Sequence, residues 1–149
     1  MAAAAVSVAQ KYDGPRPAKP DLPYLKHADS LLATEAGEAK EEKRKDDVLY
    51  VVAGAESPVK TPLASPILLF QSDKIPAEKL QLFKLGSKNG RRELLFSHKK
   101  KQMAAPIRVD VTKVSSDNIY RIEVSSTLEK GEYSLSPDES NQVFCFAVY

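Results

Sequence analysis

The chain lacks tryptophan and has one cysteine, two histidines and six glycines among its 149 residues. The single cysteine, Cys145, excludes an internal disulfide. His27 and His98 lie far apart in the sequence, and together they supply too few ligands for a closed metal site. No glycine-rich, phosphate-binding motif is present. We therefore expect neither a metal nor a cofactor.

Long apolar runs and strong net charge are also missing. No stretch approaches the roughly 18 apolar residues of a membrane-spanning helix, and a net charge of +2 is too small to indicate a polyanionic partner. Motifs of serine hydrolases and zinc proteases are absent. Cys145 lies in an apolar stretch, where a thiol stays protonated and inert. The sequence therefore predicts a non-enzymatic protein of one domain.

What is present begins with a processed-looking N-terminus. Residues 1–9 are small and uncharged, and Ser7-Val8-Ala9 has the small-x-small pattern that signal peptidase accepts, with cleavage before Gln10. We interpret residues 1–9 as the remnant of a signal peptide. This predicts export to the periplasm or the extracellular space. An unstructured alanine-rich terminus is the alternative.

Residues 10–30 are rich in proline, which favours an extended arm. The apolar side chains of this arm belong to Tyr12, Leu22, Tyr24 and Leu25. An extended chain with apolar side chains suits addition to an open sheet edge. These four residues are therefore candidate contacts with a protein partner or with a second copy of the chain. The alternatives are a spacer, or an arm that lies on its own domain.

Residues 31–47 form a charged segment, in which ten of the thirteen residues from Glu35 to Asp47 are charged. Helix propensity and Glu–Lys pairing favour a solvated helix, although Gly37 weakens it. No apolar stripe anchors such a helix to a core. An exposed hairpin arm is the alternative for this segment.

From residue 48 to 149 the pattern is that of β-strands. Asn89-Gly90 favours a type I′ turn that sets Leu85 opposite Leu94 and Phe83 opposite Phe96. In a second hairpin, the SSDN turn at 115–118 sets Val109 opposite Val124 and Val111 opposite Ile122. The final strand, 143–149, is apolar on both faces, which places it in the middle of a sheet or under a cover.

The segment Gly131-Glu-Tyr133-Ser-Leu135 resembles the tyrosine corner of immunoglobulin-like sandwiches. This resemblance covers the C-terminal third and implies a buried Tyr133 whose hydroxyl bonds to backbone near residues 128–131. The chain departs from antibody domains, because it has Leu135 in place of a cysteine and has no tryptophan. We therefore expect a mainly all-β fold, an immunoglobulin-like sandwich of about seven or eight strands over residues 48–149.

The whole chain is also similar to a group of small exported bacterial β-proteins of unknown function. These proteins share the proline arm, PRPAKPDLPYLKHAD here, and the ending SNQVFCFAVY. The resemblance implies export and carries no activity.

A basic stretch surrounds the first hairpin. Its basic residues form one patch at the turn and a second after the following strand: Lys88, Arg91, Arg92, Lys99, Lys100 and Lys101. They are candidate contacts for an anionic polymer, such as a polysaccharide, or for lipid headgroups. Nucleic acid fits less well, because no aromatic residue is interleaved with them. The alternative is that these residues only keep the hairpin soluble and protect sheet edges.

Three functions follow from these patterns. The first is a non-catalytic exported binding or assembly module that acts through its arm and sheet edges. The second is an anion-binding surface protein. The most distant is an enzyme whose site no motif marks.

Overall fold

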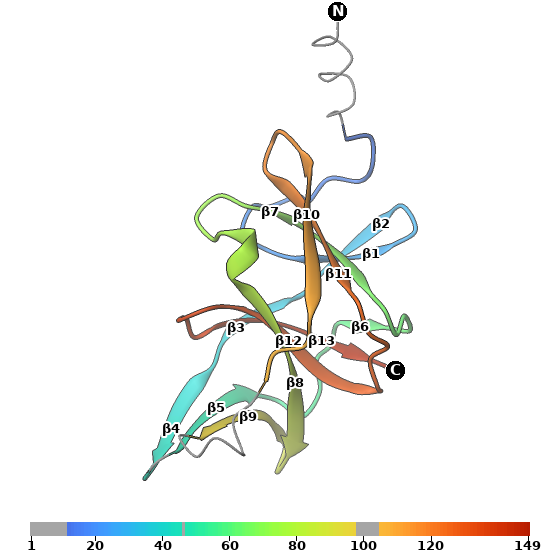
Figure 1. Cartoon of the computed structure of the whole chain (residues 1–149). Helices are drawn as coiled ribbons and strands as arrows, with labels where there is room; N and C mark the ends of the chain where they lie inside the picture. The colour runs from blue at the N-terminus through green and yellow to red at the C-terminus, as the bar shows by residue number, and fades with distance from the viewer. Residues whose placement is uncertain (1–11, 46, 98–104) are drawn as a thin grey trace, which may run out of the picture.

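The computed structural model describes residues 12–45, 47–97 and 105–149. The expected signal-peptide remnant and Lys99, Lys100 and Lys101 therefore lie outside the described residues. Within them the chain forms thirteen strands and one short 3₁₀ turn, η1, with no α-helix (Figure 1). The strands make two sheets in a sandwich-like arrangement, and all strand pairs are antiparallel except that of β6 with β13, which is parallel. The all-β expectation is thus confirmed, with more strands than the seven or eight expected.

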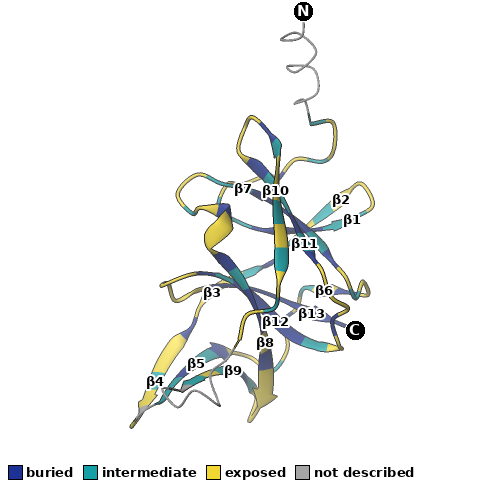
Figure 2. Cartoon of the chain, viewed as in Figure 1, coloured by how far each residue is buried: buried dark blue, intermediate teal, exposed yellow. Residues whose placement is uncertain are grey.

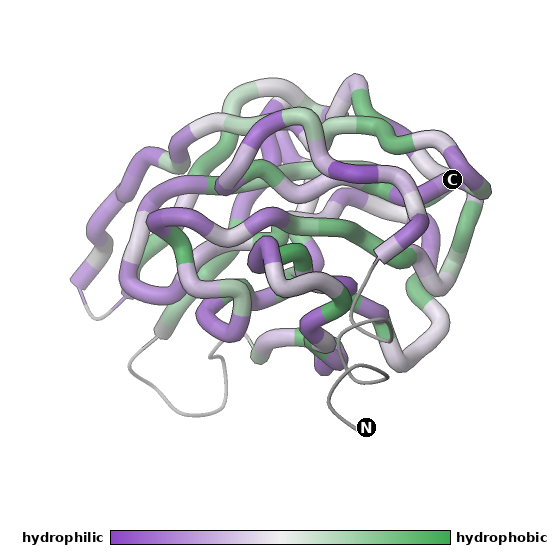
Figure 3. The backbone as a smooth tube through the Cα atoms, turned by 90° about the horizontal axis from the view of Figure 1, so that it is seen from above, coloured by the Kyte–Doolittle hydropathy of each residue, from purple (hydrophilic) through white to green (hydrophobic). Residues whose placement is uncertain are grey.

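The smaller sheet has five strands in the order β10-β11-β7-β1-β2. Their bounds are β1 Tyr24–His27, β2 Ser30–Ala33, β7 Ile67–Gln71, β10 Val109–Ser115 and β11 Ile119–Val124. The second predicted hairpin is confirmed here: Val109 pairs with Val124 and Val111 with Ile122. Figure 3 shows hydrophobic and hydrophilic positions mixed along the strands, as expected where one side is wet and the other dry.

The larger sheet has the order β3-β13-β12-β8-β9-β5-β4, and β6 pairs with β13 outside this path. The bounds of the first four strands in the sequence are β3 Glu35–Glu38, β4 Lys40–Arg44, β5 Asp47–Ala53 and β6 Lys60–Thr61. The others are β8 Leu80–Lys88, β9 Arg91–Ser97, β12 Gly131–Pro137 and β13 Gln142–Val148, and η1 spans Ala77–Lys79.

The two ends of the larger sheet are consecutive in the chain. β3 pairs with β13 and β4 pairs with β5, and only Ala39 separates β3 from β4. The Ala39 backbone N–H donates to the Asn141 carbonyl at 2.8 Å, which extends the β3–β13 pairing by one residue. The sheet therefore curls until it closes on itself. We call this closed set, β3/β4, β5, β9, β8, β12 and β13, the strand ring.

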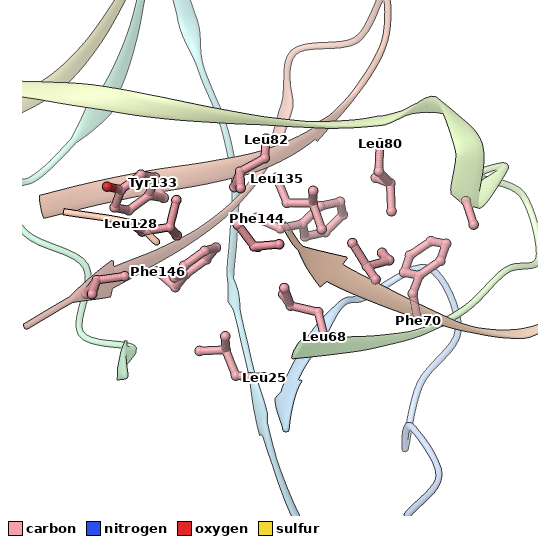
Figure 4. Close-up of a cluster of buried hydrophobic side chains, with 14 residues drawn as sticks. Leu25, Leu68, Phe70, Leu80, Leu82, Leu128, Tyr133, Leu135, Phe144 and Phe146 are labelled. Carbon is pink, nitrogen blue, oxygen red and sulfur yellow. The ribbon is translucent and has the colours of Figure 1, made fainter. Parts of the chain in front are cut away.

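Strands of the ring that face the smaller sheet bury both sides. Phe144, Phe146 and Val148 of β13 point outward and belong to the larger buried cluster, which we call the main core. Figure 4 shows Phe144 and Phe146 there, together with Leu25, Leu68 and Phe70 of the smaller sheet. Val143 and Cys145 of the same strand point into the ring and belong to a second cluster with Leu85 and Val52. Because successive side chains alternate in direction, the prediction of a final strand buried on both faces is confirmed.

Tyr133 forms the expected corner. Its ring is 1 % exposed, and its hydroxyl donates to the Glu129 carbonyl at 2.7 Å. The ring also stacks on Phe146, with 5.8 Å between centroids. The prediction of a buried tyrosine that bonds backbone within 128–131 is therefore confirmed.

The first predicted hairpin has the expected turn and register. Asn89 and Gly90 both have positive φ, +55° and +76°, as a type I′ turn requires. Lys88 pairs with Arg91 and Gly86 with Glu93, which is the expected register, but the pairing of β8 with β9 ends there. The expected backbone pairs Leu85–Leu94 and Phe83–Phe96 do not form, because Leu85 and Phe83 pair with Glu132 and Ser134 of β12. The two phenylalanine rings meet edge to face, 5.6 Å apart.

The interpretation of residues 31–47 as a helix is wrong. This segment contains β2, β3 and β4, and β4 forms a hairpin with β5 in which Arg44 pairs with Asp47. The alternative, a hairpin, is therefore correct for the second half of the segment. Local propensity favours a helix, but backbone pairing with β13 and β5 outweighs it. Most of β4 is exposed to solvent, which explains its many charges (Figure 2).

The expected boundary at residue 48 is also wrong. β1 and β2 belong to the smaller sheet, and β3 and β4 close the strand ring. The segment from 24 onward is therefore part of the folded unit. Few local signals indicate this, because β1 to β4 are short and several of their partner strands come much later in the chain.

Candidate functional site

A cavity of about 430 Å³ occupies one end of the strand ring. Its walls come from β4, β5, β8, β9, β12 and β13 and from the loop 138–141. The apolar side chains that line it are Ala39, Tyr50, Val52, Phe83, Leu85, Leu94, Phe96 and Val143. Three strands each contribute two of these side chains, two positions apart and therefore on the same face of the strand. The pairs are Tyr50 and Val52 on β5, Phe83 and Leu85 on β8, and Leu94 and Phe96 on β9. The cavity is thus an unfilled part of the ring interior.

Three aromatic rings form one continuous wall of the cavity. Phe96 lies between the other two, 5.3 Å from the centroid of Tyr50 and 5.6 Å from that of Phe83, and it meets both edge to face. Such contacts fix the orientation of each ring. Burial raises the pKa of the Tyr50 hydroxyl, and the charge of Glu41 raises it further. Tyr50 therefore stays neutral at physiological pH.

Polar side chains lie at the rim of the cavity and on one wall. We call Glu41, Asp138, Glu139 and Asn141 the mouth; all four are exposed. Asn141 donates from Nδ2 to Glu41 Oε2 at 3.0 Å, which links β4 to the β12–β13 loop. On the wall formed by β12, the Ser134 and Ser136 hydroxyls bond to each other.

The opposite end of the ring interior is closed by a buried ion pair. The Arg92 guanidinium is fully buried and contacts both oxygens of Glu35, at 2.6 and 3.2 Å. It also donates to the Gly54 and Ala53 carbonyls, at 2.9 and 2.6 Å. Nearby, Glu132 accepts from the Ser57 backbone N–H at 2.7 Å. The bonds to Glu35, Gly54 and Ala53 occupy most of the N–H donors of the Arg92 guanidinium, and the Glu35 carboxylate compensates its charge.

Cys145 lies between this closed end and the cavity wall. It is fully buried, and burial raises the pKa of its thiol to about 11, although the Arg92 charge acts in the opposite direction. The thiol is therefore protonated at neutral pH. This agrees with the expectation that Cys145 is not a nucleophile.

The cavity exists because β8 and β9 are paired only close to the turn that joins them and lie apart farther from it. Their backbone pairing runs from Lys88–Arg91 to Gly86–Glu93. Before Gly86, β8 pairs with β12, while β9 continues along β5. The Phe83–Phe96 ring contact spans the opening between the two strands, and this leaves room beside the rings.

The structure separates the expected anion-binding residues. Arg92 is buried against Glu35, so its assignment as a surface anion contact is wrong. Arg91 binds Glu42 at 2.9 Å and Glu93 at 2.7 Å, so its charge is already compensated. Lys88 is exposed beside the turn formed by Asn89 and Gly90. The described residues thus retain one of the three hairpin cations as a free surface charge.

The expected partner arm lies on its own domain. Tyr24 and Leu25 are part of β1 and are buried, and Leu22 packs against the main core. Tyr12 lies under the Arg16 guanidinium, 5.9 Å from its ring centroid. The interpretation of these residues as contacts for another chain is wrong for Tyr24 and Leu25, because both are buried in their own domain. Leu22 is partly buried, so the interpretation stays a prediction for Leu22 and Tyr12.

His27 lies on β1, and its Nε2 is 2.9 Å from the Thr61 hydroxyl. Within residues 12–45, 47–97 and 105–149, no three His, Cys, Asp or Glu side chains gather as a metal site would require. No helix in that part of the chain has the length and apolar character to cross a membrane.

The sequence does not reveal the cavity, because the lining residues are spread over the whole chain. Ala39, Glu41 and Tyr50 lie in or beside the segment whose propensity favours a helix. Asp138 and Glu139 have only the signature of loop residues. The one available signal is the predicted placement of Phe83 opposite Phe96, since two rings on the same side of a hairpin need a shared interior.

Comparison with known proteins gives no relative from which a function could be transferred. The export expected from residues 1–9 is tested neither by these comparisons nor by the contacts described above, so it stays a prediction. No family model, no curated protein and no solved structure matches this chain.

Proposed function

We propose that this chain is a non-catalytic binding protein whose ligand is a small, mainly apolar molecule held inside the strand ring. The cavity of about 430 Å³ is the observation that carries the proposal. Protein interiors are normally packed as densely as organic crystals. A space of this size with three aromatic rings in its wall has the dimensions and lining of a small-molecule pocket.

The shape of the ring supports the same conclusion. Its closed end is filled by Arg92, Glu35 and Cys145, so the interior is not a channel through the molecule. The other end reaches the surface beside Asp138 and Glu139, which are exposed. A ligand can therefore enter beside Asp138 and Glu139 and rest toward the closed end.

Binding fits the lining better than catalysis does. Nucleophilic catalysis needs a hydroxyl or thiol next to a base. The Ser134 and Ser136 hydroxyls bond to each other, and the described lining residues include no histidine or lysine. The carboxylates of the mouth are exposed, so they lack the burial that tunes catalytic groups.

The test uses N-phenyl-1-naphthylamine, a neutral probe that fluoresces in apolar surroundings. We expect saturable binding to one site per chain. Ser136→Phe places a ring in the cavity and should weaken binding by about tenfold or more. Ser116→Phe, in the exposed turn between β10 and β11, is the matched control and should not change binding.

Two results would overturn the proposal. One is the absence of saturable fluorescence with the folded wild-type chain. The other is equal affinity in Ser136→Phe and Ser116→Phe. Should Ser136→Phe not fold, Tyr50→Ala serves instead, because Tyr50 is half-buried and its ring is part of the cavity wall. Unchanged probe affinity in folded Tyr50→Ala would equally contradict the proposal.

A further inference from the structure

Among the residues that the structure describes, the charged groups that line the cavity all have one sign. They are Glu41, Asp138 and Glu139, and the described lining residues include no lysine, arginine or histidine. The chain as a whole has a net charge of +2, so an acidic mouth does not follow from its composition. A ligand that enters here passes three carboxylates.

One of these carboxylates is held in place. Asn141 Nδ2 donates to Glu41 Oε2 at 3.0 Å, and this bond leaves the other Glu41 oxygen free of the amide. Burial is the main cause of the raised pKa of the Tyr50 hydroxyl, and the Glu41 charge adds to it. Glu41 therefore lies at the junction of the mouth and the aromatic wall.

The aromatic wall favours the same sign of ligand. Ring faces carry partial negative charge and attract cations within about 6 Å. Tyr50, Phe96 and Phe83 form a continuous wall through edge-to-face contacts. Leu85 and Val143 elsewhere in the lining offer only apolar contact. The cavity is thus apolar inside, aromatic on one wall and negative at the entrance.

We infer that the ligand is an organic cation: an amine whose ammonium group lies at the mouth and whose apolar body lies against Phe83, Phe96 and Leu85. This inference rests on the proposed function. A fatty acid or other anionic amphiphile would bring a carboxylate to the three carboxylates of the mouth, and like charges repel. A neutral apolar ligand would gain nothing from those carboxylates.

The test compares three probes with the same fused-ring body: 1-naphthylmethylammonium, 1-naphthylmethanol and 1-naphthylacetate. Each displaces N-phenyl-1-naphthylamine from the wild-type chain at low salt. We expect the cation to bind about tenfold more tightly than the alcohol, and the alcohol more tightly than the anion. Added salt should reduce the difference, because the mouth is exposed.

Charge-removing variants locate the preference. The triple variant Glu41→Gln, Asp138→Asn, Glu139→Gln should bind the cation and the alcohol equally, with the affinity for the alcohol unchanged. The control triple variant Asp29→Asn, Glu56→Gln, Glu129→Gln removes the same charge from exposed sites away from the mouth and should keep the preference.

The outcomes separate this inference from the proposed function. If N-phenyl-1-naphthylamine binds and the three naphthyl probes show no order by charge, the cavity is a binding site but the cation inference is wrong. The cation inference is also wrong if both triple variants lose the preference equally. If none of the four probes binds, the proposed function and the inference are both wrong.

Discussion

Arg92 is the largest fully buried side chain among the described residues, and its role could not be read from its neighbours in the sequence. In the sequence, Arg92 is one of several cationic residues beside the Asn89-Gly90 turn. In the structure it points into the strand ring, because alternate residues of β9 face inward. A guanidinium there requires a carboxylate, and Glu35 supplies it from a segment whose local propensity favours a helix.

Glu35→Gln should therefore destabilise the fold by about 3 kcal/mol at pH 7, because it leaves a buried cation without its charged partner. Burial raises the pKa of Glu35, but the Arg92 and Ser57 hydrogen bonds and the Arg92 charge outweigh this and lower it below 4.5. A carboxyl group whose pKa is lower in the folded state than in the unfolded state stabilises the fold at higher pH. This contribution to the unfolding free energy disappears as the pH falls through the pKa of the folded state.

The difference in unfolding free energy between wild type and Glu35→Gln should accordingly shrink below about pH 4.5. Urea titrations at pH 7 and at pH 3.5 measure it. Glu129→Gln removes an exposed carboxylate and should change stability by about 0.5 kcal/mol or less at either pH. A Glu35→Gln penalty of equal size at both pH values would contradict the linkage.

Tyr133→Phe tests a single hydroxyl. Its bond to the Glu129 carbonyl is part of a fully buried corner, so the variant should lose about 1 kcal/mol of unfolding free energy. Thermal denaturation measures this loss, and Tyr149→Phe, whose ring is 64 % exposed, is the matched control. Identical melting curves for wild type and Tyr133→Phe would show that the corner does not stabilise the sandwich.

At the scale of elements, the two hairpins could be predicted because turn chemistry and alternation are local. Asn89-Gly90 and the SSDN turn each set a register that the structure reproduces. β3 and β4 could not be predicted in the same way. Their residues favour helix locally, and the strands that hold them extended, β13 and β5, impose pairing from elsewhere in the fold.

The N-terminal arm is anchored to its own domain through Asp21. Its carboxylate accepts backbone N–H bonds from Asp73, Lys74 and Ile75 at 2.9 to 3.1 Å. The Asp21 N–H in turn donates to the Gln71 carbonyl at 2.8 Å. Burial raises the pKa of Asp21, but these three N–H groups and the Lys74 charge outweigh it and lower the pKa overall.

Asp21→Asn isolates the charge, because Asn also tolerates the positive φ of +59° found here. We expect the loss of charge-assisted bonds to destabilise the chain by about 1 to 2 kcal/mol. Hydrogen exchange should be faster at the amides of Asp73, Lys74 and Ile75. Asp29→Asn, in the exposed β1–β2 turn, is the control; protection that is equal in both variants would mean that Asp21 does not anchor the arm.

At the scale of the whole molecule, the sequence predicts the class of fold but does not predict that the larger sheet closes into a ring. Alternating strands, turn residues and a final strand apolar on both faces are sufficient to indicate two packed sheets. Whether a sheet closes depends on which strands meet at its ends, and here those ends are β3 and β4. The cavity follows from closure, so it could not be predicted for the same reason.

Closure of the strand ring also has a consequence for folding during synthesis. The pairing of β3 with β13 joins residues about 100 positions apart, such as Gly37 and Val143, and contacts so distant in sequence slow folding because chain entropy is lost before they form. While the chain is emerging, β4, β5 and β9 have all been made but β3 still lacks β13. We therefore expect β3 to stay an open template for chaperones or neighbouring chains until β13 has been synthesised.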